Sequence, residues 1–156
     1  MENKEVNSVL EQFNFTMNAQ EYGNGHINQT YIVEPKYIVQ KINTDIFQNP
    51  DELMENITSV TEFLKDKITS DGGNPLRETL TVIPTKDGKP YYKSESGACY
   101  RCYEFIRDSL TLETADSADD LYEAAKGFAL FQKRLSDFPA EKLHETIKDF
   151  HHTPKR

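Results

Sequence analysis

The chain has 156 residues, of which 37% are hydrophobic and 28% charged, including eight tyrosines and nine phenylalanines. This composition is sufficient for a core, so it excludes an intrinsically disordered chain, and the length fits one domain or part of a larger one. A net charge of −8 with no basic stripe argues against nucleic acid as a partner.

The first thirteen residues, MENKEVNSVLEQF, are acidic and lack the apolar centre of a signal peptide. No apolar run approaches the length of a membrane span. Two cysteines in a chain of this size do not form a disulfide framework. We therefore expect a cytoplasmic protein that does not associate with a membrane.

Periodicity divides the first half into a helix, three strands and a second helix. Apolar residues at helical spacing predict a short helix over 5–13, and β-branched runs predict strands over 19–22, 29–34 and 37–42. The second helix has an N-cap residue at Asn49 and proline at its first position, Pro50. It is expected to end at the sequence SDGGNP.

The second half is predicted to contain strands and then two helices. Strands are expected over 79–85, 87–92 and 98–106, with a hairpin at Asp87-Gly88. One helix carries an apolar stripe that we interpret as core, and the other begins at Pro139 with Leu143, Ile147 and Phe150 on one face. The stripe is formed by Leu121, Ala124, Phe128, Phe131 and Leu135. This order predicts an α+β fold with a mostly antiparallel sheet and one packed helix.

The segment GNGHIN carries two glycines, Gly23 and Gly25, between two predicted strands. A Rossmann fingerprint or a Walker A loop would require a helix after the glycines, so neither fits. Two interpretations remain: a plain hairpin turn, or a glycine-rich loop over nucleotide phosphates of the kinase type. In the kinase arrangement a strand cation, a helix carboxylate and a hinge strand follow in that order. The runs YIVQKI, PDELMENI and RCYEFI occur in this order.

The chain also resembles a known family over nearly its whole length, from about Tyr22 to Arg156. The stretches YGNGHINQTYIV, YIVQKINTDIF, LMENI, YRCYEFI, FALFQKRLSDF and ETIKDFHHTPKR resemble the N-terminal part of bacterial N-acetylhexosamine 1-kinases. These enzymes belong to the aminoglycoside phosphotransferase and choline kinase-like superfamily, and some relatives carry a label linking them to mucin desulfation.

The resemblance implies a protein-kinase-like N-lobe over 1–107 and the first helices of a truncated C-lobe over 108–156. The whole protein would use ATP and Mg²⁺ to phosphorylate the anomeric hydroxyl of a small sugar acceptor. Other acceptors of the superfamily, such as an aminoglycoside, choline or homoserine, stay open, as does a non-enzymatic binding module. The nucleotide-binding residues implied are Gly23, Asn24, Gly25, His26 and Asn28 in the loop, with His26 also facing the sugar, and Glu104, Phe105 and Ile106 in the hinge.

Two features depart from the family pattern. The first is that neither the phosphate-binding cation nor its carboxylate partner is assigned to a single residue. The strand lysine of kinases falls at Gln40 or Lys41, which strand alternation places on opposite faces: charge favours Lys41 and the register of the run favours Gln40. The helix carboxylate is either Glu52 or Glu55, and Asn56 is an alternative.

The second departure is the lack of a catalytic loop. No His-x-Asp followed by Asn occurs downstream of Phe105, and no later metal-binding Asp is found. Phosphoryl transfer needs a positioned base and metal ligands. We therefore expect no catalytic residue and no metal ligand in this chain, which would be an inactive part of a larger enzyme.

Cysteine and histidine patterns are interpreted as structural. Cys99 and Cys102 form a C-x-x-C in a predicted strand, where they would lie on opposite faces as ordinary core thiols. His144, His151 and His152 are interpreted as a solvated helix end rather than a metal site.

Overall fold

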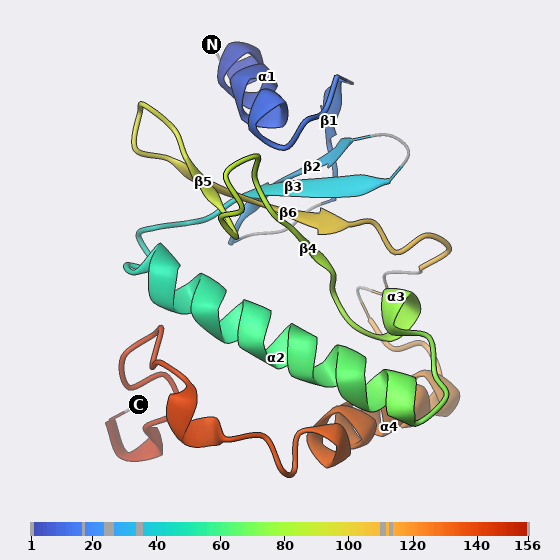
Figure 1. The fold of residues 1–156 in the computed structure, drawn as a ribbon. Coiled ribbons are helices and arrows are strands. Elements are labelled where there is room, and N and C mark those ends of the chain that lie inside the picture. Colours follow the sequence, from blue (N-terminus) through green and yellow to red (C-terminus); the bar gives the residue numbers. More distant parts are fainter. Residues whose placement is uncertain are drawn as a thin grey trace.

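The computed structural model describes residues 2–16, 18–23, 27–33, 36–109, 112 and 114–155. One antiparallel sheet lies between the N-terminal helix α1 (Glu2–Gln12) and the long helix α2 (Pro50–Ser70) (Figure 1). The C-terminal part of the chain runs along α2 on the side turned away from the sheet. The predicted α+β class is therefore confirmed.

The sheet has six strands: β1 (Ala19–Glu21), β2 (Gln29–Val33), β3 (Tyr37–Lys41), β4 (Val82–Ile83), β5 (Tyr92–Lys93) and β6 (Cys99–Glu104). Their order is β1-β2-β3-β6-β4, and β5 pairs with the start of β6. All of these pairings are antiparallel. The last strand in the sequence therefore lies inside the sheet, between β3 and β4.

The two faces of the sheet pack against different helices. The first, which we call the α1 face, is covered by Val6, Val9 and Leu10 of α1 and by Phe13; it carries the side chains of Tyr31, Val33, Val39, Tyr100 and Cys102. On the second, the α2 face, Ile42 and Cys99 pack against Leu53 and Met54. Because Cys99 and Cys102 belong to different clusters, the prediction that their thiols lie on opposite faces is confirmed, and both are buried and free.

Helix α2 begins as the sequence predicts. The side chain of Asn49 accepts a hydrogen bond from the backbone N–H of Glu52, and Pro50 occupies the first turn, where its missing N–H costs nothing. Gly72 follows the helix with a φ of +75°, a left-handed conformation that glycine adopts without a steric penalty. A short helix, α3 (Pro75–Glu78), comes next and was not anticipated; Asn74 caps it.

Helix α4 (Ala118–Arg134) begins at a capping box formed by Ser117 and Asp120. Ion pairs join its C-terminal end to the ends of α2 and α3: Arg134 contacts Asp71, the C-cap of α2, and Glu78, the last residue of α3. The interpretation of its apolar stripe as core is wrong for the described residues. Leu121, Phe128 and Phe131 are 62%, 74% and 48% exposed. Helical spacing shows which side of a helix is apolar but not whether another element covers it.

The prediction of a helix after Pro139 is also wrong. The chain forms a single 3-10 turn, η1 (Ala140–Lys142), and a second, η2 (Thr153–Lys155), follows later. Leu143 is extended, which presents the backbone of the next residue, His144, to the side chain of Asn56. Asp149 has a φ of +58°, which is incompatible with a continuous helix.

The strands expected over 79–85 and 87–92 are shorter than predicted, because only β4 and β5 make ladder pairs there. No helix in the described part of the chain is long and apolar enough to cross a membrane.

Candidate functional site

The glycine segment forms the connection between β1 and β2. Gly23 has a φ of +77°, and apart from its chain neighbours no described residue has an atom within 4 Å of the position that a Cβ would take. The preceding residue, Tyr22, donates its backbone N–H to the carbonyl of Thr30 at 2.9 Å, which closes the base of the hairpin. Three of the predicted loop residues, Asn24, Gly25 and His26, lie outside the described residues.

Asn28, at the far side of the hairpin, has a local structural contact. Its Oδ1 accepts a hydrogen bond from the backbone N–H of Asn43 at 3.0 Å. This bond ties the end of the hairpin to the segment that follows β3. The side chain of Asn28 therefore holds the position of the glycine segment relative to the sheet.

The glycine segment also contacts the segment that follows β6. The rings of Tyr22 and Phe105 meet edge to face, with centroids 5.7 Å apart. Such a pair is favourable beyond the area it buries. Two groups of predicted site residues, far apart in the sequence, are thus brought together at one end of the sheet.

The backbone of the predicted hinge is partly used by the sheet. The N–H of Glu104 donates to the carbonyl of Thr81 at 2.9 Å, and that of Phe105 donates to the carbonyl of Lys36 at 2.5 Å. Among the described residues, no backbone bond of this kind engages the N–H of Ile106. Of the three hinge residues, Ile106 is therefore the one whose main-chain donor is left for another partner.

A row of polar side chains crosses three neighbouring strands on the α2 face. Antiparallel register places Gln40 opposite Thr30 on one side and opposite Arg101 on the other. The amide Nε2 of Gln40 donates to Thr30 Oγ1 at 3.1 Å. Its Oε1 accepts two hydrogen bonds from Arg101, from Nε at 3.2 Å and from Nη2 at 3.1 Å. The row fixes the orientation of the guanidinium.

Arg101 is the single charged residue in the described part of the chain that is buried, with 9% of its surface exposed. Burial lowers its pKa, because desolvation disfavours the charged form. Its guanidinium carbon lies 5.3 Å from the centroid of the Tyr103 ring, which offers a cation–π contact. No ion pair joins Arg101 to a carboxylate of the described residues. A charge withdrawn from water without an opposite charge is energetically costly.

Lys41 lies on the other face of the sheet, one residue along β3, where Tyr31, Val39 and Tyr100 also lie. It is close enough to α1 to influence Glu5. The pKa of Glu5 is lowered chiefly by hydrogen bonds from Ser96 and Ser94, with a smaller contribution from the charge of Lys41. The expectation that Gln40 and Lys41 point to opposite faces is confirmed, and Gln40 is the one that faces α2.

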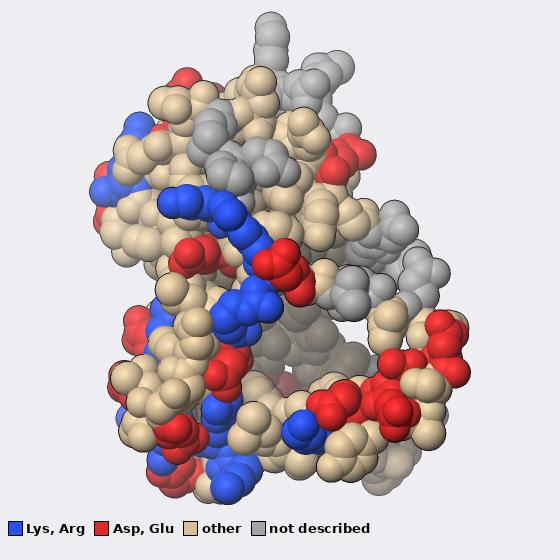
Figure 2. Space-filling model, turned by 90° about the vertical axis from the view of Figure 1, so that its right-hand side faces the viewer, with Lys and Arg blue, Asp and Glu red and all other residues tan. Residues whose placement is uncertain are grey.

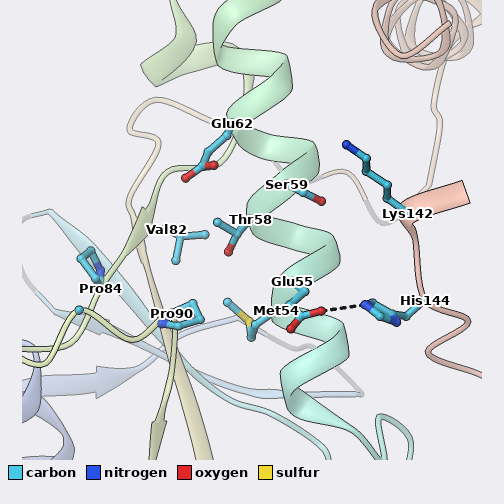
Figure 3. A pocket seen from close by; sticks show the side chains of 11 residues that line it. Met54, Glu55, Thr58, Ser59, Glu62, Val82, Pro84, Pro90, Lys142 and His144 are labelled. Carbon is cyan, nitrogen blue, oxygen red and sulfur yellow. Dashed lines mark hydrogen bonds and ion pairs between the residues drawn. The ribbon is translucent and has the colours of Figure 1, made fainter. Parts of the chain in front are cut away.

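Within the described residues, none of the three candidate partners on α2 makes a hydrogen bond or an ion pair with Gln40 or Lys41. Glu55 is exposed, and its Oε2 lies 2.8 Å from Nε2 of His144 (Figure 3). The side-chain amide of Asn56 donates to the carbonyl of His144 and accepts from its N–H, both at 2.9 Å. Glu52 lies in the first turn of the helix. Glu55 and Asn56 therefore hold the C-terminal segment on α2, which gives His144 a docking contact that the sequence did not suggest.

A cleft of about 560 Å³ borders the same part of α2. Figure 3 shows Met54, Thr58 and Glu62 on the helix, Val82 and Pro90 on the sheet side, and Lys142 and His144 on the opposite side. The hydroxyl of Thr58 is buried without a hydrogen-bond partner in the described structure. Glu55 is the one predicted site residue that lines this cleft, which is therefore distinct from the polar row on the sheet.

The molecule is hollowed between its upper part, which carries the sheet, and its lower part at the level of α4 (Figure 2). Asp and Glu side chains gather on the lower part in this view. The described residues contain no group of three or more His, Cys, Asp or Glu that could hold a metal ion.

Sequence reasoning missed Arg101, although a signal was present. Every residue from Cys99 to Tyr103 is buried, and an arginine in the middle of such a strand is unusual. The signal was overlooked because the kinase pattern places the phosphate-binding cation on β3, at Gln40 or Lys41, and not on β6. The sequence matches no model of a known protein family.

Proposed function

We propose that this chain is the ATP-binding part of a small-molecule kinase that phosphorylates the anomeric hydroxyl of N-acetylhexosamines. The observation that carries the proposal is the contact between Tyr22 and Phe105, which sets the glycine turn against the segment after β6. A kinase-type site needs these two parts close together, because one covers the phosphates and the other receives the base.

Three further features support the proposal. The elements follow the kinase order: a glycine hairpin, a strand, a helix packed on the sheet, and a strand that leads into the hinge. The polar row of Thr30, Gln40 and Arg101 faces α2 at the position expected for the strand cation. The N–H of Ile106, which makes no backbone hydrogen bond within the described residues, offers a donor for an adenine nitrogen.

In this proposal each part of the chain has a separate task. Gly23, with Asn24, Gly25 and His26, lets the backbone approach the phosphates, since a side chain at a left-handed position would be strained. Glu104, Phe105 and Ile106 bind the adenine through main-chain groups and through the Phe105 ring. ATP supplies the phosphoryl group, and the base and Mg²⁺ ligands that the transfer requires lie outside this chain.

A coupled ATP-consumption assay on the complete gene product tests the proposal. The acceptors are N-acetylglucosamine, N-acetylgalactosamine, choline and an aminoglycoside. Turnover with the two N-acetylhexosamines alone, with phosphate at the anomeric oxygen, is expected. Turnover with choline or the aminoglycoside alone would assign the chain to another kinase of the superfamily. No turnover with any acceptor, and no ATP binding, would leave a non-enzymatic module in which the glycines form only a turn.

A further inference from the structure

The α2 face of the sheet holds one positive charge that the described chain does not neutralise. Arg101 is 9% exposed, and both of the hydrogen bonds that it makes within the described residues go to a neutral amide oxygen, that of Gln40. Arginine stays protonated in proteins, so this charge cannot be relieved by losing a proton. A buried cation with polar but uncharged partners is expected to bind an anion strongly.

The other cations on the sheet strands are placed differently. Lys41 lies on the α1 face, where its charge acts on Glu5, and the polar row lies on the opposite face of the sheet. Lys93, on the edge strand β5, is exposed to water, where a point charge contributes little. Of the cations on the described sheet strands, Arg101 alone combines burial, a fixed orientation and a place beside Gln40, one of the two residues predicted at the position of the kinase lysine.

We propose that Arg101 binds the phosphate groups of the nucleotide, with Gln40 as the positioning residue that holds its guanidinium. This inference rests on the proposed ATP-binding function and names the cation of that site. The strand lysine of kinases is then replaced by two residues: a neutral glutamine on β3 and an arginine on the neighbouring strand β6. Thr30 completes the arrangement, because its hydroxyl accepts a hydrogen bond from the Gln40 amide nitrogen and so turns the amide oxygen towards Arg101.

The geometry of the guanidinium supports this assignment. Two of its nitrogens, Nε and Nη2, converge on a single oxygen of Gln40. The remaining nitrogen, Nη1, makes no hydrogen bond with a described residue, and it is not completely buried. A phosphate oxygen can be reached by this nitrogen while Gln40 keeps the plane of the group fixed. Arginine suits phosphate because its planar fork matches the anion.

Titration calorimetry with ATP, adenosine and inorganic tripolyphosphate tests the inference on wild type and variants. Arg101→Met should weaken the binding of ATP and tripolyphosphate roughly 10- to 100-fold, the range expected for charge-assisted hydrogen bonds, and leave adenosine unchanged. Gln40→Glu is the isosteric companion: it places a carboxylate on the guanidinium, so ATP binding should weaken while the melting temperature rises. Lys93→Met is the matched control, which removes a strand cation that the site does not use.

Each outcome decides between the two proposals. Equal ATP affinity of wild type and Arg101→Met would overturn the role of Arg101 even if the protein binds ATP. A loss of ATP affinity in Lys41→Met but not in Arg101→Met would also overturn the role of Arg101. If tripolyphosphate binds through Arg101 but ATP binds no better than tripolyphosphate, the anion site stands and the nucleotide function fails. If wild type binds none of the three ligands, both proposals fail.

Discussion

Arg101 and Gln40 face each other across the junction of β3 and β6, and a single oxygen of Gln40 accepts both hydrogen bonds of the guanidinium. This pair places a full positive charge inside the sheet with only a neutral partner. Folding must therefore bear a desolvation cost at this position, which a purely structural strand would avoid. The pair can be tested for stability separately from ligand binding.

A double-mutant cycle at this pair should show strong coupling. Gln40→Leu leaves the guanidinium without its partner and is expected to reduce the free energy of unfolding by roughly 1–3 kcal/mol. The double variant Gln40→Leu/Arg101→Met removes the charge as well, and it should be at least as stable as wild type, because apolar replacements of buried charges are often neutral or stabilising. Urea denaturation measures the free energy of unfolding of both variants. A double variant less stable than Gln40→Leu alone would contradict the idea that Arg101 is a cost to the fold.

Gly23 should be sensitive to substitution even though space is available. Gly23→Ala is expected to lower the free energy of unfolding by about 1–2 kcal/mol, because alanine is strained at a φ of +77°. Gly127 is the matched control: it lies in α4, and apart from the nearby backbone of that helix no described residue approaches within 4 Å of its Cβ position. Gly127→Ala should stabilise the protein by about 0.5–1 kcal/mol through helix propensity. Chemical denaturation of both variants gives the comparison, and equal effects would show that the turn tolerates a side chain.

The contact of Asn56 with His144 should control the docking of the C-terminal segment. Asn56→Ala removes both amide bonds to the His144 backbone and is expected to speed amide exchange and limited proteolysis over 138–152. Ser59→Ala, one turn further along α2, removes only a local bond to the carbonyl of Asn56 and serves as the control. Hydrogen exchange followed by mass spectrometry measures the exchange rates of this segment in both variants. Unchanged exchange in Asn56→Ala would show that other contacts, such as Lys67 with Asp137 and Phe63 with Phe138, are sufficient to hold the segment on α2.

The stability of the protein should fall in alkaline solution. Burial raises the pKa of Cys102 and of Tyr103 to about 12 in the folded protein. In the unfolded chain these groups titrate near pH 8.5 and 10, respectively. Above about pH 8.5 the unfolded state therefore binds fewer protons than the folded state, so the free energy of unfolding decreases as pH rises towards 12.

Urea midpoints between pH 7 and pH 10.5 measure this decline. Cys102→Ala removes the buried thiol and should make the curve flatter between about pH 8.5 and pH 10, where tyrosine has not yet ionised in the unfolded chain. If the urea midpoint falls equally steeply with pH in wild type and in Cys102→Ala, ionisation of Cys102 is not coupled to unfolding.

Local signals in the sequence were sufficient to predict most of the elements around the sheet. The cap at Asn49 and the proline after it located the start of α2 to the residue, because both act within one turn of the chain. Alternation along a strand was enough to place Cys99 and Cys102 on opposite faces, as it depends only on the pleat. These predictions succeeded since neighbouring residues alone decide them.

Features that depend on distant partners could not be predicted. The helix expected after Pro139 is replaced by extended chain at Leu143, because a side chain 88 positions earlier binds the next residue. The apolar stripe of α4 correctly predicted a helix, but the prediction that its side chains are buried was wrong. Arg101 was missed for the same kind of reason: its position beside Gln40 follows from the register between β3 and β6, which the sequence does not state.

The place of β6 inside the sheet has a consequence for synthesis on the ribosome. Strand β3 pairs with β2 as soon as both have emerged, but its other edge must wait about sixty residues for Cys99–Glu104. During that interval the nascent chain presents an open strand edge with Val39 and Ile38 beside it, a surface prone to pairing with other chains. Chaperone capture of arrested chains should therefore drop sharply once residue 104 has left the exit tunnel, because the completed sheet no longer offers that edge.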